Sequence, residues 1–174
     1  LMSNFQANLR ALFTTENDLE DLIKHLNERV MNSAKGEKFI TLFIAKYNSK
    51  TRQLDYINAG HNPPLLYDIE KNEMQLLSSG CVGMGMLDTI PFINRKKIQI
   101  HSKAKMLLYT DGLVEIIEGD GVEFGTKYIE EEISDDDTID RNITDIIKHL
   151  KIGKDDTSVF DDISILGIQF NNNV

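Results

Sequence analysis

Two short acidic stretches of this sequence place carboxylates where a buried strand is expected to meet a turn. Asp111 and Gly112 follow the apolar run KMLLYT, and Asp161 and Asp162 come directly before the apolar run ISILGIQF. If the two runs form neighbouring strands, their ends bring these carboxylates together. Clustered carboxylates repel one another and need a divalent cation between them, and a site with only oxygen ligands favours Mg²⁺ or Mn²⁺ over zinc.

Each acidic stretch taken alone also has an ordinary structural explanation. Asp-Gly is a common turn, and Asp-Asp before a strand is a common capping pair. A phosphatase of the haloacid-dehalogenase type is excluded, because it needs an aspartate nucleophile two residues before Asp111 and that position is Tyr109. A calcium-binding EF-hand in EGDGVEFG is excluded as well, because the oxygen ligands do not recur at the required spacing.

Composition and charge restrict the classes of partner. The 174 residues carry 19 basic and 28 acidic side chains, a net charge of −9, and no basic stripe, which argues against nucleic acid as a ligand. No apolar run approaches the ~20 residues of a membrane span, and no signal peptide is recognisable. The length of 174 residues predicts a single domain. The single cysteine, Cys81, cannot form an internal disulfide, which fits the reducing cytoplasm that we expect.

Apolar periodicity predicts two helices near the start of the chain. The first has an apolar face formed by Met2, Phe5, Leu9, Leu12 and Phe13. The second has one formed by Leu19, Leu22, Ile23, Leu26 and Val30. Residues 14–17 offer capping groups for the second helix.

The middle of the chain changes to the pattern of β-strands joined by short turns. We expect a strand over residues 39–47 that forms a hairpin with LDYINAG, followed by strands in LLYDI, MQLLS, INRKKIQIH and KMLLYT. The glycine-rich stretch SSGCVGMGMLDTIP is expected to be a loop, with Met84 and Met86 as irregular core packing rather than a flap. Two helices, in GTKYIEEEIS and TIDRNITDIIKHLKI, precede the last strand. Segregated strands and helices with short turns predict an α+β fold with antiparallel sheets.

Three motifs together are more specific than any one of them. NAGHNPPLLY, LLYTDGLVE and DDISILGI occur in this order and at these separations, and FITLFIAKYN and GVEFG are further matching segments. This set resembles the bacterial SpoIIE/RsbU-type branch of the PPM metal-dependent serine/threonine phosphatases. The resemblance covers nearly the whole chain.

The resemblance implies both a fold and a metal chemistry. The family fold is an α-β-β-α sandwich, in which two antiparallel sheets are flanked by helices. The family binds two Mn²⁺ or Mg²⁺ ions, and a water bridging them attacks phosphorus directly. By motif position, Asp111 and Asp161 are metal ligands. Asp162 then supports the ligands or caps the strand, and Gly112 shapes the turn.

The resemblance also assigns roles near the first hairpin and reveals one departure. Asn58 and His61 in NAGHNPP are expected to support the site structurally rather than to act in catalysis. The family's first metal motif, an aspartate followed closely by Gly-His-Gly, would lie before Leu1 and has no counterpart in this sequence. We therefore expect the chain to be the larger, C-terminal part of the domain, inactive or weakly active alone, with exposed edges that could support a homodimer.

The function implied by the resemblance is hydrolysis of phosphoserine or phosphothreonine on a regulatory protein. In this branch that protein is usually a phosphorylated anti-sigma-factor antagonist, and an upstream sensor or receiver domain controls the phosphatase. The main alternative is a non-catalytic protein-binding module of the same fold, which would have no need to keep both Asp111 and Asp161. A phosphomonoesterase acting on small molecules is a third reading that the sequence leaves open.

Overall fold

The chain folds into two compact units, each containing one β-sheet and its own helices. The computed structural model describes residues 1–15, 18–34, 36–101, 103–116, 125–150 and 162–171. Unit 1 comprises residues 1–61 and 78–99, and unit 2 comprises residues 62–77 and 100–174.

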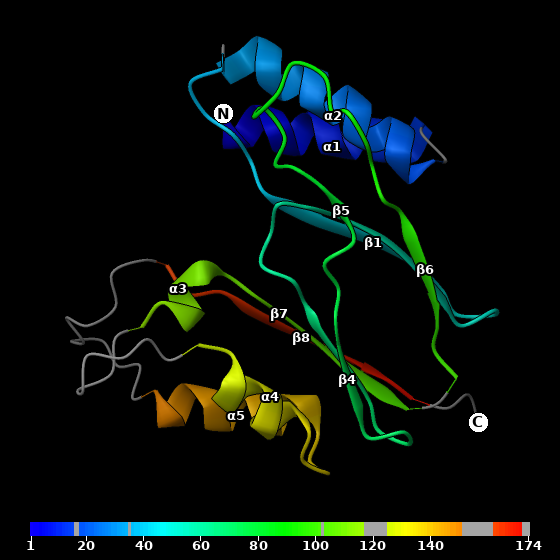
Figure 1. Ribbon diagram of the computed structural model, residues 1–174, viewed down its shortest axis with the longest axis vertical. Coiled ribbons are helices and arrows are strands. Elements are labelled where there is room, and N and C mark those ends of the chain that lie inside the picture. Colours follow the sequence, from blue (N-terminus) through cyan, green and yellow to red (C-terminus); the bar gives the residue numbers. More distant parts are fainter. Residues whose placement is uncertain (16–17, 35, 102, 117–124, 151–161, 172–174) are drawn as a thin grey trace. The chain divides into compact units, whose positions relative to one another are not determined.

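Two helices of unit 1 pack side by side, α1 (Met2–Thr15) and α2 (Leu19–Ala34) (Figure 1). The predicted apolar face of α2 is confirmed, since its members are at most 2% exposed: Leu19, Leu22, Ile23, Leu26 and Val30. The predicted cap within residues 14–17 is wrong. Asp18 caps α2 instead, because its Oδ1 accepts a hydrogen bond from the Glu20 amide at 2.8 Å.

The sheet of unit 1 is built around the predicted hairpin. β1 (Leu42–Asn48) and β2 (Gln53–Ala59) pair antiparallel. On the other side of β2, β6 (Lys96–Gln99) pairs antiparallel with its first half and β5 (Gly80–Cys81) pairs parallel with its end. The parallel pairing was not predicted from the sequence, because β5 is only two residues long and lies within the glycine-rich stretch.

Close approach of the backbone explains a glycine in β5. A Cβ at Gly80 would lie 1.8 Å from the carbonyl oxygen of Asn58, so no other residue fits without moving β2. The following loop is fixed by Asn27 of α2, which is 2% exposed and accepts a hydrogen bond from the Gly85 amide at 2.8 Å. Met84 is fully buried in the core, as expected, whereas Met86 is 46% exposed.

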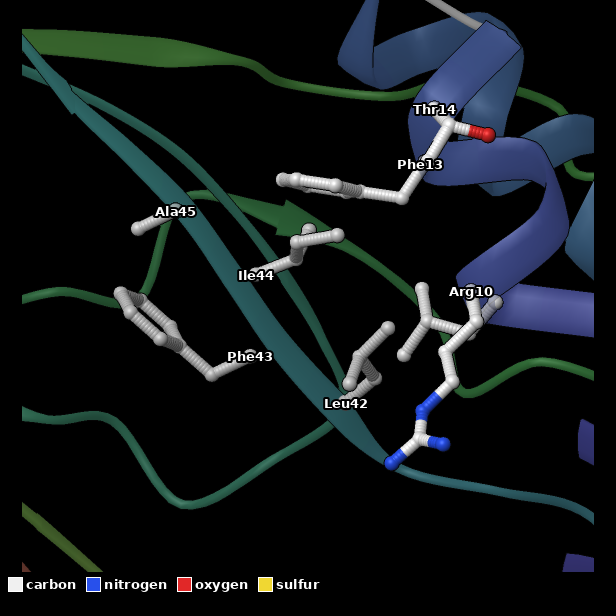
Figure 2. A pocket seen from close by; sticks show the side chains of 8 residues that line it. Arg10, Phe13, Thr14, Leu42, Phe43, Ile44 and Ala45 are labelled. Carbon is white, nitrogen blue, oxygen red and sulfur yellow. The ribbon is translucent and has the colours of Figure 1, made fainter. Parts of the chain in front are cut away.

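A groove of about 570 Å³ runs between α1 and β1. Its lining comes from both elements: Leu9, Arg10, Phe13, Thr14, Leu42, Phe43, Ile44 and Ala45. Figure 2 shows Phe13 reaching from α1 toward β1, with Leu42 and Ile44 directed toward the helix. Consecutive residues of a strand point to opposite faces of a sheet, so four of them share one groove only where it follows the strand's edge. Within the part of the chain that the structure describes, no strand pairs with this edge of β1.

Unit 2 contains a four-stranded sheet in which every neighbouring pair is antiparallel. The strands lie in the order β4 (Glu73–Leu76), β3 (Leu65–Asp68), β7 (Ala104–Tyr109) and β8 (Ile165–Phe170). All four match strands predicted from the sequence. The pairing of β7 with β8 is the one that bears on the acidic residues, because it joins the two runs that carry them.

Three helices belong to the described part of unit 2. α4 (Lys127–Ile133) and α5 (Ile139–His149) match the two predicted helices and lie side by side (Figure 1). α5 packs closely over β8, where a Cβ at Gly167 would lie 2.4 Å from Cγ1 of Ile139. The single turn α3 (Asp111–Val114) was not predicted.

A lysine lies in the interior of unit 2. Lys105 of β7 is 1% exposed, and its Nζ donates to the carbonyl oxygens of Ile133 at 3.2 Å and of Asp135, and to Oδ1 of Asn142 at 2.9 Å. Burial lowers the pKa of Lys105, and the nearby acidic side chains of residues 135–137 and 132 oppose that shift. The ammonium group thus satisfies carbonyl groups at and just beyond the C-terminal end of α4.

The α+β class predicted from the sequence is confirmed, with two sheets and helices packed against them. No helix among the described residues is both long enough and apolar enough to span a bilayer.

Candidate metal centre

Asp111 stands at the point where β7 gives way to α3. The strand ends at Tyr109, and Asp111 is the first residue of the helical turn. Its side chain is exposed, and Oδ1 accepts a hydrogen bond from the Gly112 amide at 3.1 Å. Among the residues that the structure describes, no lysine, arginine or histidine forms an ion pair with it. An exposed carboxylate is a ligand of the kind that hard metal ions prefer.

The segment that leads into β8 lies beside this turn. The register pairs Tyr109 with Ile165, so the last residue of β7 and the first residue of β8 lie side by side at one end of the strands. The Thr110 amide donates to the Ser164 carbonyl at 3.1 Å, and the Thr110 hydroxyl donates to the Asp162 carbonyl at 3.0 Å. The condition set in the sequence analysis, that the strands next to the two acidic stretches are neighbours, is therefore met.

The described residues supply only part of a metal site. Asp161, the second predicted ligand, lies outside them, and no group of three His, Cys, Asp or Glu side chains within them is arranged to hold an ion. The donors where β7 ends and β8 begins are carboxylate and carbonyl oxygens, which suit Mn²⁺ or Mg²⁺ rather than zinc. The donor chemistry of Asp111 and the neighbouring segment thus fits the predicted cation.

Asn58 and His61 belong to unit 1 and form a closed turn at the end of β2. The Asn58 side chain donates from Nδ2 to the His61 carbonyl at 2.9 Å and accepts at Oδ1 from the His61 amide at 2.8 Å. Asn58 is 4% exposed, and Gly60 between them has a φ of 70°, which favours glycine. The Asn58 amide group therefore fixes the backbone of the turn, which is a structural task. A contribution to metal binding remains a prediction.

Tyr109 lies on the core side of the strand end. It is 3% exposed, and burial raises the pKa of its phenol, with a further contribution from the negative charge of Glu130. The phenol is therefore neutral at physiological pH. A neutral, buried phenol is not the nucleophile that a haloacid-dehalogenase mechanism requires at this position.

Two residues with clear structural tasks were missed in the sequence. Thr110 joins β7 to the segment before β8, and its only signal was a hydroxyl residue at the end of a predicted strand. Lys105 was missed because a lysine in a strand is normally read as solvent-exposed. Alternate residues of a strand share a face, so Lys105 was to be expected on the same face as Leu107 and Tyr109, and that alternation was the available signal.

Comparison with known proteins identifies the family. A model of the family "Stage II sporulation protein E (SpoIIE)" matches residues 1–171. The phosphoserine phosphatase RsbP of Bacillus subtilis is 26% identical over 97 residues, which are 56% of this chain and 24% of RsbP. The chain thus spans about a quarter of the length of this relative.

Solved structures show the same fold across both units. The SiaA-PP2C domain of Pseudomonas aeruginosa matches with a TM-score of 0.80 and 16% identity, covering 97% of this chain and 68% of that domain. RsbX, solved in complex with magnesium, matches with a TM-score of 0.65 and 20% identity, covering 95% of this chain and 73% of RsbX. The matched range and the shared fold agree with the motifs at Asn58, Asp111 and Asp161, and the chain belongs to the SpoIIE family of PPM-type phosphatase domains.

Proposed function

We propose that this chain is part of a metal-dependent serine/threonine protein phosphatase. The observation that supports the proposal is the antiparallel pairing of β7 with β8, in which Thr110, the residue directly before Asp111, is hydrogen-bonded to Asp162. Family membership supports it, since RsbP is named a phosphoserine phosphatase. The magnesium bound by RsbX supports a divalent cation as the cofactor.

The residues of the chain would hold and orient the reactants. Asp111 and Asp161 would ligate the cations, and Asp162 and Gly112 would shape the backbone around them. Two bound Mn²⁺ or Mg²⁺ ions would supply a water of lowered pKa and neutralise charge on the phosphoryl oxygens. Asn58 would keep its turn rigid through its two hydrogen bonds to His61.

The proposed substrate is a phosphorylated regulatory protein, of the anti-sigma-factor antagonist type that the family resemblance implies. A sensor or receiver domain elsewhere in the full-length protein would control the reaction, and the cytoplasm is the proposed compartment. The net charge of −9 favours recognition through a basic or neutral surface of the substrate over recognition of another strongly acidic protein.

Phosphate release by the full-length protein tests the proposed activity. A phosphoserine-containing protein of the anti-sigma-factor antagonist type should lose its phosphate in the presence of Mn²⁺ or Mg²⁺, and EDTA should stop the reaction. Readdition of Mn²⁺ in excess over EDTA should restore it. Release that continues in EDTA would contradict the metal mechanism, and tight binding of the phosphoprotein without any release would favour the non-catalytic alternative.

We propose further that the 174-residue chain on its own pairs with a second copy along β1. The edge of β1 is open in the described part of unit 1, and the adjoining groove is largely apolar. An open edge readily pairs with another strand, and burial of apolar surface adds about 25 cal/mol per Å². Light scattering at micromolar concentration should give the mass of a dimer.

A charge in the groove should weaken this association. Ala45→Lys is expected to shift the scattering mass toward the monomer, because the lysine would have to be desolvated against apolar side chains. Ile147→Lys is the matched control, since Ile147 is an exposed apolar residue in unit 2 and should not affect the dimer. A wild-type chain that is monomeric at every concentration would exclude the proposed pairing.

A further inference from the structure

Thr110 makes three hydrogen bonds to the segment that leads into β8. Its amide donates to the Ser164 carbonyl at 3.1 Å. Its hydroxyl donates to the Asp162 carbonyl at 3.0 Å and accepts from the Ser164 amide at 2.9 Å. The Thr110 hydroxyl thus binds two backbone groups of the segment before β8, the Asp162 carbonyl and the Ser164 amide.

The reason for this arrangement is the change from strand to helix. In an antiparallel ladder the Ser164 amide would donate to the backbone carbonyl of Thr110. That carbonyl instead accepts the Leu113 amide at 3.1 Å, because the chain turns into α3 directly after Thr110. The hydroxyl therefore replaces the carbonyl as the acceptor for Ser164, and the two strands remain joined while Asp111 leaves the sheet.

The Thr110 hydroxyl does not cap the helix α3 that follows it. Thr110 is the N-cap residue of α3 and has the extended backbone typical of that position, with φ of −85° and ψ of 162°. A threonine at an N-cap normally accepts a hydrogen bond from the first turn of its own helix. Here its side chain makes no such bond. The hydroxyl serves the contact with the segment of Asp162 and Ser164 instead.

We propose that Thr110 is a positioning residue that fixes the Asp111 carboxylate relative to the segment entering β8. The inference rests on the proposed function, in which Asp111 and Asp161 ligate metal, because Thr110 directly precedes the first and is bonded to Asp162, which directly follows the second. Without the hydroxyl, the Asp162 carbonyl and the Ser164 amide lose their partner and the ends of the two strands can separate. Metal ligands that are less well oriented bind the ion more weakly.

Two substitutions separate the hydroxyl from the shape of the side chain. Thr110→Val keeps the branched shape and removes both hydroxyl hydrogen bonds, whereas Thr110→Ser keeps the hydroxyl and removes the methyl group. In the full-length protein, Mn²⁺ alone is titrated and free Mn²⁺ is followed by electron paramagnetic resonance. Thr110→Val should raise the Kd for Mn²⁺ by roughly 10-fold or more, the range found when partners of metal ligands are lost. Thr110→Ser should bind like the wild type.

A second readout tests the contact itself. Exchange of the Ser164 amide hydrogen should be slow in the wild type and in Thr110→Ser, and faster in Thr110→Val. Thr144→Val is the matched control, because the Thr144 hydroxyl makes one hydrogen bond within α5, to the Asp140 carbonyl at 2.8 Å. It should leave both the Mn²⁺ titration and the Ser164 exchange unchanged.

The outcomes distinguish this inference from the proposed function. A wild-type protein that binds Mn²⁺, together with a Thr110→Val variant that binds it equally well, would overturn the positioning role alone. Loss of binding in Thr110→Ser to the same extent as in Thr110→Val would also overturn it, because the hydroxyl would then not be the cause. A wild-type protein that binds no Mn²⁺ would overturn the proposed function and the positioning role with it.

Discussion

Replacement of Asp111 by asparagine should remove nearly all metal-dependent phosphatase activity from the full-length protein. The amide is a neutral and weaker ligand than the carboxylate, and metal ions supply several kcal/mol of transition-state stabilisation in such reactions. A loss of about 3 kcal/mol corresponds to a fall in kcat/KM on the order of 100-fold, and we expect at least that. Initial rates with a phosphoserine protein, at several Mn²⁺ concentrations, measure the effect.

Asp140→Asn provides the control for the change in charge. Asp140 is an exposed aspartate in the first turn of α5, and its side chain has no assigned task in the site. This variant should retain the wild-type kcat/KM within about two-fold, since isolated surface substitutions usually have small effects. If Asp111→Asn and Asp140→Asn have the same kcat/KM at saturating Mn²⁺, Asp111 is not a required ligand.

Replacement of Lys105 by methionine should have the largest effect on stability. Methionine is of similar length but leaves the carbonyl groups of Ile133 and Asp135 and the Asn142 side chain without their donor. Each buried acceptor left unpaired costs about 1–3 kcal/mol, and removal of a buried charge from its partners costs about 3–5 kcal/mol. Relief of the desolvation that lowers the pKa of Lys105 offsets part of this cost. We expect a net loss of about 3 kcal/mol in the free energy of unfolding, measured in urea at pH 7.

Lys148→Met is the matched control for this prediction. Lys148 is exposed and pairs with Asp145 at 3.0 Å, an interaction of a kind that contributes at most about 1 kcal/mol. An unfolding free energy for Lys105→Met that equals that of Lys148→Met would show that the buried ammonium does not stabilise the end of α4. Asn142→Ala should destabilise the protein as well, because Asn142 is fully buried and also donates to the Glu132 carbonyl at 2.8 Å.

The sequence was sufficient for the elements that have a strong apolar period. The α2 face from Leu19 to Val30 was predicted because burial of one face fixes its pattern. The hairpin of β1 and β2 and the four strands of unit 2 were predicted from short apolar runs bounded by turn residues. The sequence predicted β7 and β8 as strands but left open whether they are neighbours, and the structure shows that they pair. Because Asp111 directly follows the run KMLLYT, its position just after the end of β7 could be predicted as well.

The features that were missed depend on contacts between distant segments. The parallel pairing of β5 rests on the close approach of Gly80 to Asn58, which local propensity does not encode. The cap of α2 was predicted within residues 14–17 rather than at Asp18, because several residues with capping side chains precede α2. The hydroxyl of Thr110 acts on residues more than 50 positions away, and the burial of Lys105 depends on carbonyl groups at and beyond the end of α4.

The position of bound manganese tests the central claim most directly. Crystals of the full-length protein grown with Mn²⁺ should show anomalous scattering from a metal ion bonded to the Asp111 carboxylate, at the edge where β7 ends and β8 begins. The ligands should also include Asp161. An ion bound elsewhere, with the Asp111 carboxylate in solvent and no metal at this edge of the sheet, would contradict the account.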